Sequence, residues 1–263
     1  MWIEKKIKNP IYFELKKLKL ISNKNIFKFH NKTRDSNISV LKDKISEIVF
    51  LEKIKTDKNY YTSLKYKKKF NKNTKKDLRE FEKIKISTKK SSNRYIKSPI
   101  VDDNLRRMKQ FNKLLINKEI LDFGCGWGGF LKLLKKTKSL NGIELREECI
   151  NFIKLNLKKI NIKNNINEFN KKFDIITLFH VLEHFPQQVK ILKNIKLNLK
   201  KGGKIIIEVP HAKDFLIMQD ELSEFKDFSF WSEHLILHTR ESLKKVISRA
   251  GFKKIRIKYY QRY

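Results

Sequence analysis

The segment that most constrains the fold is the glycine-rich run at residues 119–130. An apolar stretch leads into Asp122, glycines follow at positions 124, 126, 128 and 129, and a helical pattern begins where they end. This order of residues predicts a buried strand, a tight turn and the start of a helix. In α/β sheets, a turn of this kind lies where nucleotide-like cofactors bind. We therefore expect a cofactor site at this turn.

Strand and helix patterns alternate from residue 119 onwards. Apolar runs that predict further strands lie at residues 140–144, 160–162, 173–179, 204–209 and 252–260. Amphipathic helical patterns, such as the one from Glu147 to Lys158, separate most of these runs. The alternation predicts an α/β fold with a doubly wound, mostly parallel, Rossmann-like sheet.

The N-terminal part of the chain follows a different pattern. Short strands are expected at Ile11–Phe13 and Ile26–Phe29, and a hairpin is expected over residues 38–51. The favoured role for this part is packing, and a binding module is the alternative. The expected division of the chain is therefore a small β-rich N-terminal unit at 1–55, a basic linker or lid at 56–97 and the α/β domain at 98–263.

The chain is strongly basic, with a formal net charge of +34. Such a charge is typical of proteins that bind nucleic acid or an anionic membrane. Lys and Asn are nevertheless abundant throughout, even inside helical patterns, as an AT-rich coding sequence would produce. A solvated surface is therefore the favoured interpretation. A nucleic-acid partner remains the alternative, with residues 1–117 as its docking surface because the excess of basic residues is greatest there.

Cysteine usage and hydropathy indicate the compartment. The two cysteines, Cys125 and Cys149, lack the spacing of metal ligands, so we expect a reduced cytoplasmic environment and no metal site. The first six residues lack the apolar core of a signal peptide. No apolar stretch reaches the roughly 18 residues that a membrane span requires.

Two cofactor classes fit the glycine turn. Gly124, Gly126 and Gly129 match the dinucleotide-binding pattern, and Glu144 lies 22 residues past Asp122, so a nicotinamide-dependent oxidoreductase is one alternative. The carboxylate of Asp122 favours the other class, because it would repel a pyrophosphate at close range. S-adenosylmethionine has no phosphate and carries an ammonium and a sulfonium. The predicted cofactor is therefore S-adenosylmethionine, with its ribose hydroxyls bound by Glu144.

Several segments together resemble a known family. The chain from about residue 98 to residue 258 is similar to class I S-adenosylmethionine-dependent methyltransferases of the type 11/type 23 branch. The segments that carry the resemblance are 120–131, 142–144, 173–184, 199–210, 231–235 and 249–252. The resemblance implies that the cofactor contacts are made by Asp122, Gly124, Gly126, Glu144 and Phe179. Because many relatives of this branch modify sugars, polysaccharide precursors or other small metabolites, it also implies a small-molecule acceptor.

The chain departs from the family pattern in three places. The sheet of these enzymes usually ends in an antiparallel hairpin, whereas this chain stops at Tyr263 after what resembles the first of its two strands. Either the final strand is absent or the polypeptide is truncated. The acid that often binds adenine is replaced by Asn164 and Asn165. Some relatives have cysteine pairs in a β-rich N-terminal module, and residues 38–51 contain none, so no zinc site is expected there.

Two histidines are the candidate catalytic residues. His180 follows the predicted strand 173–179, beside the expected position of the methyl group, and a histidine can accept a proton near neutral pH. Shaping the cofactor pocket is an equally supported role for it. His234 lies in the insertion at 211–238 and is a candidate acceptor-side residue. The alternative for His234 is packing beside Trp231.

The remaining polar residues near the predicted site have weaker cases. Glu183, His184 and His238 are expected to be structural, whereas Glu208 and His211 flank the end of a strand on the active face. Arg106 and Arg107 are candidates for pairing with the cofactor carboxylate.

The sequence therefore predicts methyl transfer from S-adenosylmethionine to a small molecule, such as a sugar or a polysaccharide or lipid precursor. The alternatives are an RNA or protein methyltransferase that docks through its basic N-terminal half, a non-catalytic methyltransferase-like scaffold, and the nicotinamide-dependent oxidoreductase. The oligomeric state is not specified by any of these patterns.

Overall fold

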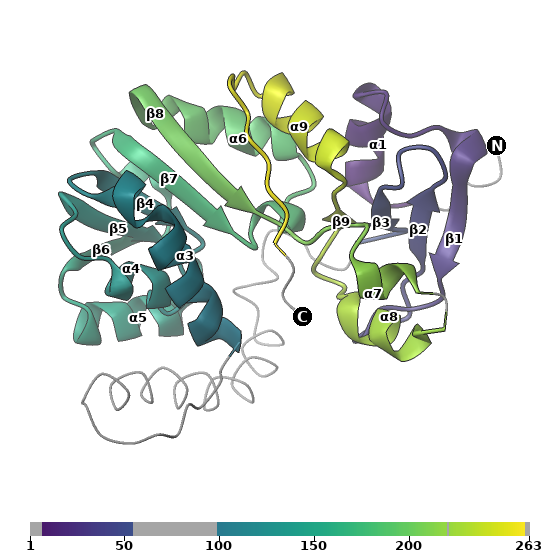
Figure 1. Ribbon diagram of the computed structural model, residues 1–263, viewed down its shortest axis with the longest axis horizontal. Helices are drawn as coiled ribbons and strands as arrows, with labels where there is room; N and C mark the ends of the chain where they lie inside the picture. The colour runs from purple at the N-terminus through teal and green to yellow at the C-terminus, as the bar shows by residue number, and fades with distance from the viewer. Residues whose placement is uncertain (1–6, 55–98, 220, 261–263) are drawn as a thin grey trace. The chain divides into compact units, whose positions relative to one another are not determined.

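A computed structural model describes residues 7–54, 99–219 and 221–260 (Figure 1). The predicted linker or lid at 56–97 lies outside the described residues. The chain divides into two compact units, which are described separately. The parallel-sheet unit comprises residues 58–179 and 198–206, and the antiparallel-sheet unit comprises residues 1–57, 180–197 and 207–263.

The parallel-sheet unit is built on a five-stranded sheet in the order β6-β5-β4-β7-β8 (Figure 1). Its strands are β4 (Glu119–Phe123), β5 (Ser139–Ile143), β6 (Ile160–Lys163), β7 (Phe173–Phe179) and β8 (Leu199–Glu208). β4 pairs in parallel with both β5 and β7, and β5 pairs in parallel with β6. The order of strands reverses direction at β4, so the carboxyl end of β4 is the switch point where open α/β sheets bind ligands. The predicted fold class is confirmed.

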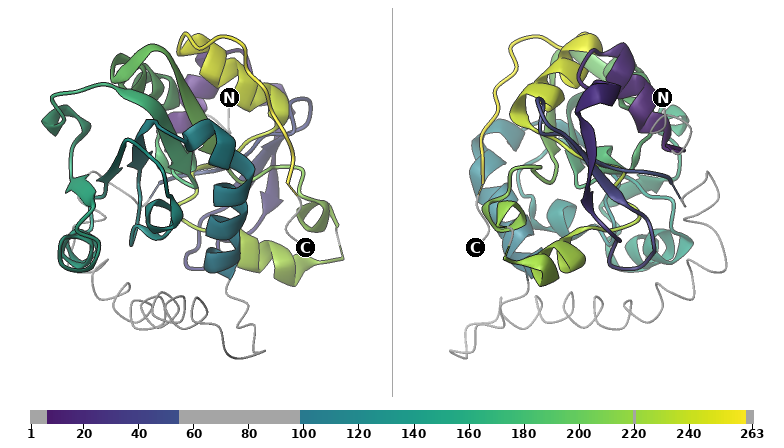
Figure 2. Two further views of the ribbon diagram at one scale, coloured as in Figure 1. Left: turned by 60° about the vertical axis from the view of Figure 1, so that its left-hand side comes forward. Right: turned by 90° about the vertical axis from the view of Figure 1, so that its right-hand side faces the viewer.

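Three helices accompany this sheet, namely α3 (Pro99–Leu115), α4 (Gly129–Leu133) and α5 (Glu147–Asn156) (Figure 2). One apolar core joins them to the strands, and Leu115, Ile120, Phe130 and Ile153 are buried in it. Burial of each such side chain contributes roughly 1.5–3 kcal/mol. A short 3₁₀ helix, η3 (Ile166–Glu168), precedes β7. It begins with a capping box between Asn165 and Glu168. The core therefore fixes the strand ends that carry the candidate site.

The antiparallel-sheet unit contains a four-stranded sheet in the order β1-β2-β3-β9. The strands are β1 (Ile26–His30), β2 (Val40–Asp43), β3 (Val49–Leu51) and β9 (Ile236–Leu237), and each neighbouring pair is antiparallel. The predicted strand at Ile26–Phe29 and the predicted hairpin are confirmed. β9 comes from the far end of the chain and pairs Ile236 with Phe50.

The strand predicted at Ile11–Phe13 is wrong, because these residues lie in the helix α1 (Pro10–Lys17). The side chain of Asn9 accepts a hydrogen bond from the backbone N–H of Ile11 at 3.1 Å, and Pro10 occupies the first turn, where its missing N–H has no cost. Ile11, Tyr12 and Leu15 are buried at helical spacing. The local cap and the buried helical face outweigh the β-propensity of the short apolar run.

The other regular elements of this unit are helices. It contains η1 (Asn23–Asn25), η4 (Leu182–His184), α6 (Gln188–Leu197), α7 (Phe215–Met218), α8 (Ser223–Ser229) and α9 (Arg240–Arg249). The carboxylate of Glu14 accepts hydrogen bonds from the backbone N–H groups of Gln188 (2.7 Å) and Val189 (2.9 Å). An acid at the start of a helix satisfies free N–H groups and suits the helix dipole. α1 and α6 are thereby joined.

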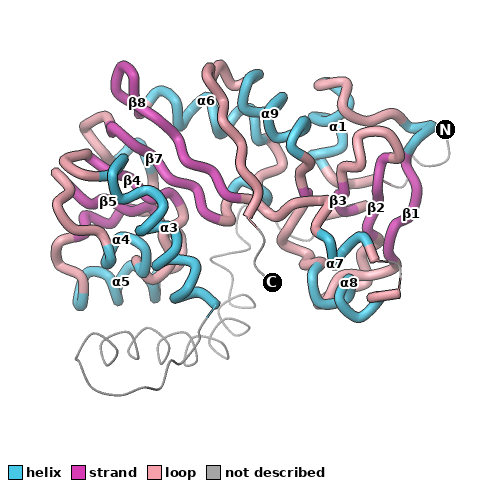
Figure 3. Tube along the Cα trace, in the orientation of Figure 1, coloured by secondary structure: helices cyan, strands magenta, loops and turns pink. Residues whose placement is uncertain are grey.

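The last strand predicted, at residues 252–260, is also wrong. After α9 the described chain runs as a loop (Figure 3). A strand requires a neighbour for its backbone N–H and C=O groups, and residues 252–260 take part in no strand pairing within the described part of the chain. Among the described residues, no helix has the length and apolar character needed to cross a membrane.

Candidate active site

The glycine turn after β4 adopts the conformation that its sequence predicts. Gly124 and Gly126 have φ angles of 78° and 55°, in the left-handed region that favours glycine. The N–H groups of Gly124 and Cys125 both donate to the carbonyl of Ile143, each at 2.9 Å. The turn is thereby tied to the end of β5.

Asp122 is buried at the carboxyl end of β4. In the register of the sheet it lies opposite Gly142 on one side and Thr177 on the other. The hydroxyl of Thr177 donates to Asp122 Oδ1 at 2.6 Å. Burial raises the pKa of Asp122 to about 6, although the hydrogen bond from Thr177 and the positive charge of Arg107 oppose this shift. A buried acid with this pKa has a strong electrostatic preference for a cationic ligand.

Glu144 lies one residue past the end of β5 and is also buried. Oε2 accepts hydrogen bonds from the N–H of Gly126 (2.9 Å) and from Nη2 of Arg146 (3.0 Å). Oε1 accepts from the N–H groups of Leu145 (2.9 Å) and Arg146 (3.0 Å) and from Nε of Arg146 (3.0 Å). Burial raises the pKa of Glu144, but Arg146 and these backbone donors outweigh it and lower the pKa overall.

Phe179 ends β7 beside a buried arginine. Its ring contacts Phe111 and Phe130, with centroids 6.4 Å and 4.9 Å away. The guanidinium carbon of Arg107 lies 4.6 Å from the centroid of the same ring, within cation–π range. Of the two arginines singled out in the sequence, Arg107 is the more buried and acts electrostatically on Asp122.

All five residues predicted to bind the cofactor therefore lie at the carboxyl edge of the parallel sheet. They are Asp122, Gly124, Gly126, Glu144 and Phe179. Their positions follow from the parallel register, in which the ends of β4, β5 and β7 lie next to one another. Sequence reasoning missed Thr177 and Arg146. The position of Thr177 between apolar residues of β7 is a usable signal, since a buried hydroxyl requires a partner. No local signal identified Arg146.

The candidate catalytic residues lie in the antiparallel-sheet unit. His180 has a φ of 55°, a strained angle for a non-glycine residue. Its backbone N–H donates to the carbonyl of Glu208 at 2.9 Å. Its ring lies between two carboxylates, with Nδ1 3.3 Å from Glu183 Oε1 and Nε2 3.3 Å from Glu208 Oε1. The side chain is 42% exposed.

His234 lies near the same buried glutamate. Burial lowers the pKa of His234 to about 4, which leaves it neutral near pH 7, although the charge of Glu183 opposes the shift. Its ring centroid lies 5.1 Å from that of His184. The structure thus places both predicted catalytic histidines, His180 and His234, around Glu183.

The two other histidines of this segment differ from them. His238 is buried, and its two ring nitrogens lie 2.9 Å from the hydroxyl of Ser242 and 2.8 Å from the side-chain oxygen of Gln188. These bonds agree with the structural role expected for it. His211 packs edge-on against Tyr259, with ring centroids 4.9 Å apart, and burial lowers its pKa.

Comparison with known proteins identifies the family. A family model described as a methyltransferase domain matches residues 93–257, which is more than half of the chain. The chain belongs to this family, and the sequence resemblance to class I S-adenosylmethionine-dependent methyltransferases is confirmed. The methyl donor of this class is S-adenosylmethionine.

Individual relatives match smaller parts. A tRNA U34 carboxymethyltransferase of Nautilia profundicola is 36% identical over 104 residues, covering 36% of this chain and 35% of the relative. A ubiquinone biosynthesis O-methyltransferase of Coxiella burnetii is 33% identical over 101 residues, covering 35% of this chain and 43% of the relative. A solved S-adenosylmethionine-dependent methyltransferase from Archaeoglobus fulgidus has a TM-score of 0.49 at 21% identity, covering 61% of this chain and 73% of that one. The chain thus spans less than half the length of the first two relatives.

Proposed function

We propose that the protein transfers a methyl group from S-adenosylmethionine to a small-molecule acceptor. The observation that carries the proposal is the carboxyl edge of the parallel sheet, where two buried acids, Asp122 and Glu144, flank a glycine turn in a chain of the methyltransferase domain family. The anionic edge suits a cofactor with an ammonium and a sulfonium and opposes a pyrophosphate. This is the argument against the nicotinamide-dependent alternative.

The residues of the edge fit the parts of this cofactor. We assign the ammonium of its amino-acid part to the region of Asp122 and the glycine turn, its carboxylate to Arg107, and its ribose hydroxyls to Glu144. When bound, the cofactor supplies an electrophilic methyl group. Phe179 and the apolar residues that it contacts exclude water, so the protein's main contribution to an in-line displacement is alignment.

We propose His180 as the base that accepts the acceptor's proton. His180 directly follows Phe179 in the chain, so its backbone lies at the carboxyl end of β7. The carboxylates of Glu183 and Glu208, both 3.3 Å from its ring nitrogens, would stabilise the imidazolium formed when the proton is taken up. His234 is proposed as an acceptor-side residue. We also propose a cytoplasmic location, since Cys125 and Cys149 are both free and buried.

One alternative acceptor has a specific observation in its favour. A tRNA U34 carboxymethyltransferase of Campylobacter fetus is 28% identical over 225 residues and covers 77% of each chain. Together with the net charge of +34, this makes tRNA the second candidate acceptor. A non-catalytic scaffold is disfavoured because the two acids and the glycine turn that a cofactor requires are all present.

The test of the proposed function has two stages. Calorimetry should detect binding of S-adenosylhomocysteine but not of NAD, and Glu144→Ala should reduce that binding at least tenfold with an unchanged circular dichroism spectrum. Labelled S-adenosylmethionine is then incubated with a cell extract divided into small-molecule and tRNA fractions, and the product is identified by mass. Label in the small-molecule fraction supports the proposal, whereas label confined to tRNA replaces its acceptor. Binding of NAD in place of S-adenosylhomocysteine would refute the cofactor assignment.

A further inference from the structure

Three of the six histidines of the chain surround one buried carboxylate. Glu183 is fully buried, and His180, His184 and His234 lie around it. A fully buried glutamate is rare unless a partner compensates its charge. The cluster therefore needs a source of positive charge.

Glu183 and His234 both contain buried polar atoms that have no hydrogen-bond partner among the described residues. Neither carboxylate oxygen has a hydrogen-bond partner among the described residues, and the contact with His180 Nδ1 is an ionic one at 3.3 Å. His234 lies beside Glu183 in this cluster. Its buried Nδ1 likewise has no hydrogen-bond partner in the described part of the chain. A neutral imidazole and an ionised carboxylate are the forms in which these groups bind metals.

His184 is oriented as metal-binding histidines usually are. Its Nδ1 lies 2.9 Å from the backbone carbonyl of Glu233, to which only a protonated Nδ1 can donate. This bond fixes the tautomer with its lone pair on Nε2. The backbone also joins the two segments of the cluster, since the N–H of Leu235 donates to the carbonyl of Glu183 at 3.0 Å. The ligand-bearing side chains are therefore held by the fold.

We propose that Glu183, His184 and His234 bind a divalent transition-metal ion, most readily Zn²⁺. One potential ligand atom from each residue lies within 4.8 Å of the others, so modest side-chain rotations would bring them to the distances of a zinc site. Two imidazoles and a carboxylate form the ligand set of zinc sites that keep a fourth position open. Water or an oxygen of the acceptor would occupy that position. The cysteines, from which no metal site is expected, take no part in this cluster.

The test measures metal binding directly and does not depend on methyl transfer. The full chain is stripped with a chelator, dialysed and titrated with Zn²⁺ in competition with a chromophoric chelator. We expect one ion per chain. His234→Ala and Glu183→Gln should each weaken its binding at least 100-fold, with unchanged circular dichroism. The matched control is His30→Ala, since His30 pairs with Asp227 outside the cluster and should not affect the affinity.

A second measurement covers the case in which the variants do not fold. Co²⁺ added to the wild-type chain should produce the visible absorption of a tetrahedral ion, and X-ray absorption of the zinc form should show two imidazole ligands. Binding that is weak, or equally affected by His30→Ala, would overturn the proposal. So would a zinc spectrum dominated by sulfur, which would assign the ion to Cys125 and Cys149.

Discussion

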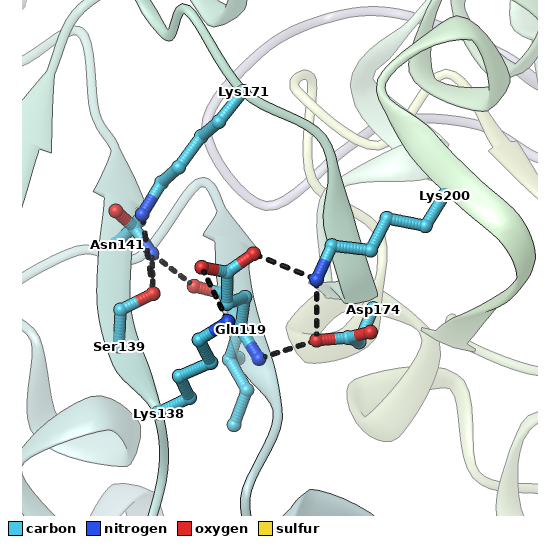
Figure 4. Close-up of polar contacts among 8 residues, drawn as sticks. Glu119, Lys138, Ser139, Asn141, Lys171, Asp174 and Lys200 are labelled. Atoms are coloured by element: carbon cyan, nitrogen blue, oxygen red, sulfur yellow. Dashed lines mark hydrogen bonds and ion pairs between the residues drawn. The ribbon is translucent and has the colours of Figure 1, made fainter.

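The two edges of the parallel sheet use charged residues in opposite ways. At the amino edge, Nζ of Lys200 lies 2.8 Å from Glu119 and 3.1 Å from Asp174, and Asp174 also accepts a hydrogen bond from the N–H of Glu119 at 2.8 Å (Figure 4). At the carboxyl edge, Asp122 is buried with a hydroxyl as its neutral partner. The first edge contains acids and bases that compensate one another. At the second, Glu144 is paired with Arg146, whereas the hydrogen-bond partner of Asp122 is the neutral hydroxyl of Thr177.

The pKa values follow the same division. The hydrogen bond from Lys200 lowers the pKa of Glu119, and although burial raises the pKa of Asp174, the N–H of Glu119 and Lys200 lower it overall. Burial raises the pKa of Asp122 to about 6. A lowered pKa means that folding favours the charged acid, and a raised pKa means that folding disfavours it. The amino edge therefore stabilises the fold. At the carboxyl edge, Glu144 has a lowered pKa and also stabilises the fold, whereas Asp122 reduces stability in a manner typical of binding sites.

The largest effect is expected for Asp122→Asn. The amide keeps an oxygen for the hydroxyl of Thr177 but removes the charge, so the affinity for S-adenosylhomocysteine should fall at least 100-fold in calorimetry. The fold should gain stability, because a pKa raised from 3.8 to about 6 costs up to about 3 kcal/mol once the acid is ionised. Urea unfolding should show a gain that is absent well below the unfolded-state pKa of 3.8, grows between that value and the folded-state pKa of about 6, and is constant at higher pH.

The control for this comparison is Asp174→Asn at the amino edge. It should leave the affinity unchanged and should reduce stability at neutral pH, because the acid that it removes has a lowered pKa. If Asp122→Asn destabilised the fold as well, the assignment of opposite roles to the two edges would fail.

A smaller effect, of opposite sign for binding, is expected for Arg146→Ala. The carboxylate of Glu144 accepts five hydrogen bonds, two of them from the Arg146 side chain, which saturates its roughly four lone-pair directions. The ribose hydroxyls can bind only after some of these bonds are released. Removing the guanidinium should therefore increase the affinity for S-adenosylhomocysteine about three- to tenfold. Lys154→Ala, on the exposed face of α5, is the matched control. A lower affinity in Arg146→Ala would instead mean that Arg146 orients Glu144 for the cofactor.

The sequence predicted the carboxyl edge better than the rest of the molecule. Asp122, the glycines and Glu144 lie on strands and turns whose patterns are local, and parallel pairing then brings them together without further information. The histidine cluster is different, since His234 reaches Glu183 through contacts between segments about 50 residues apart, which periodicity does not encode. β9 was missed for the same reason, because a two-residue strand becomes visible only through its pairing with Phe50.

Two local errors have the same physical basis. Ile11–Phe13 was assigned to a strand from its β-propensity, but the Asn9 cap and the helical spacing of its buried residues determine a helix. Residues 252–260 have a strand-like pattern in which apolar and basic residues are interspersed, but they lack a described neighbour to complete the backbone hydrogen bonds. Propensity describes a segment, whereas strand formation also requires a partner.

The smallest effect is expected for Lys200→Gln at the amino edge. Its ammonium is exposed, so the midpoint of unfolding should fall only slightly, and the difference should disappear in about 1 M salt, where screening is strong. The stabilisation depends on ionised Glu119 and Asp174, whose pKa values are lowered from 4.5 and 3.8. The stabilisation should therefore be present at neutral pH. It should be lost as the pH falls through the lowered pKa values that Glu119 and Asp174 have in the folded state. Lys201→Gln, at an exposed neighbouring position, is the control. A change in cofactor affinity in Lys200→Gln would show that the two edges are coupled.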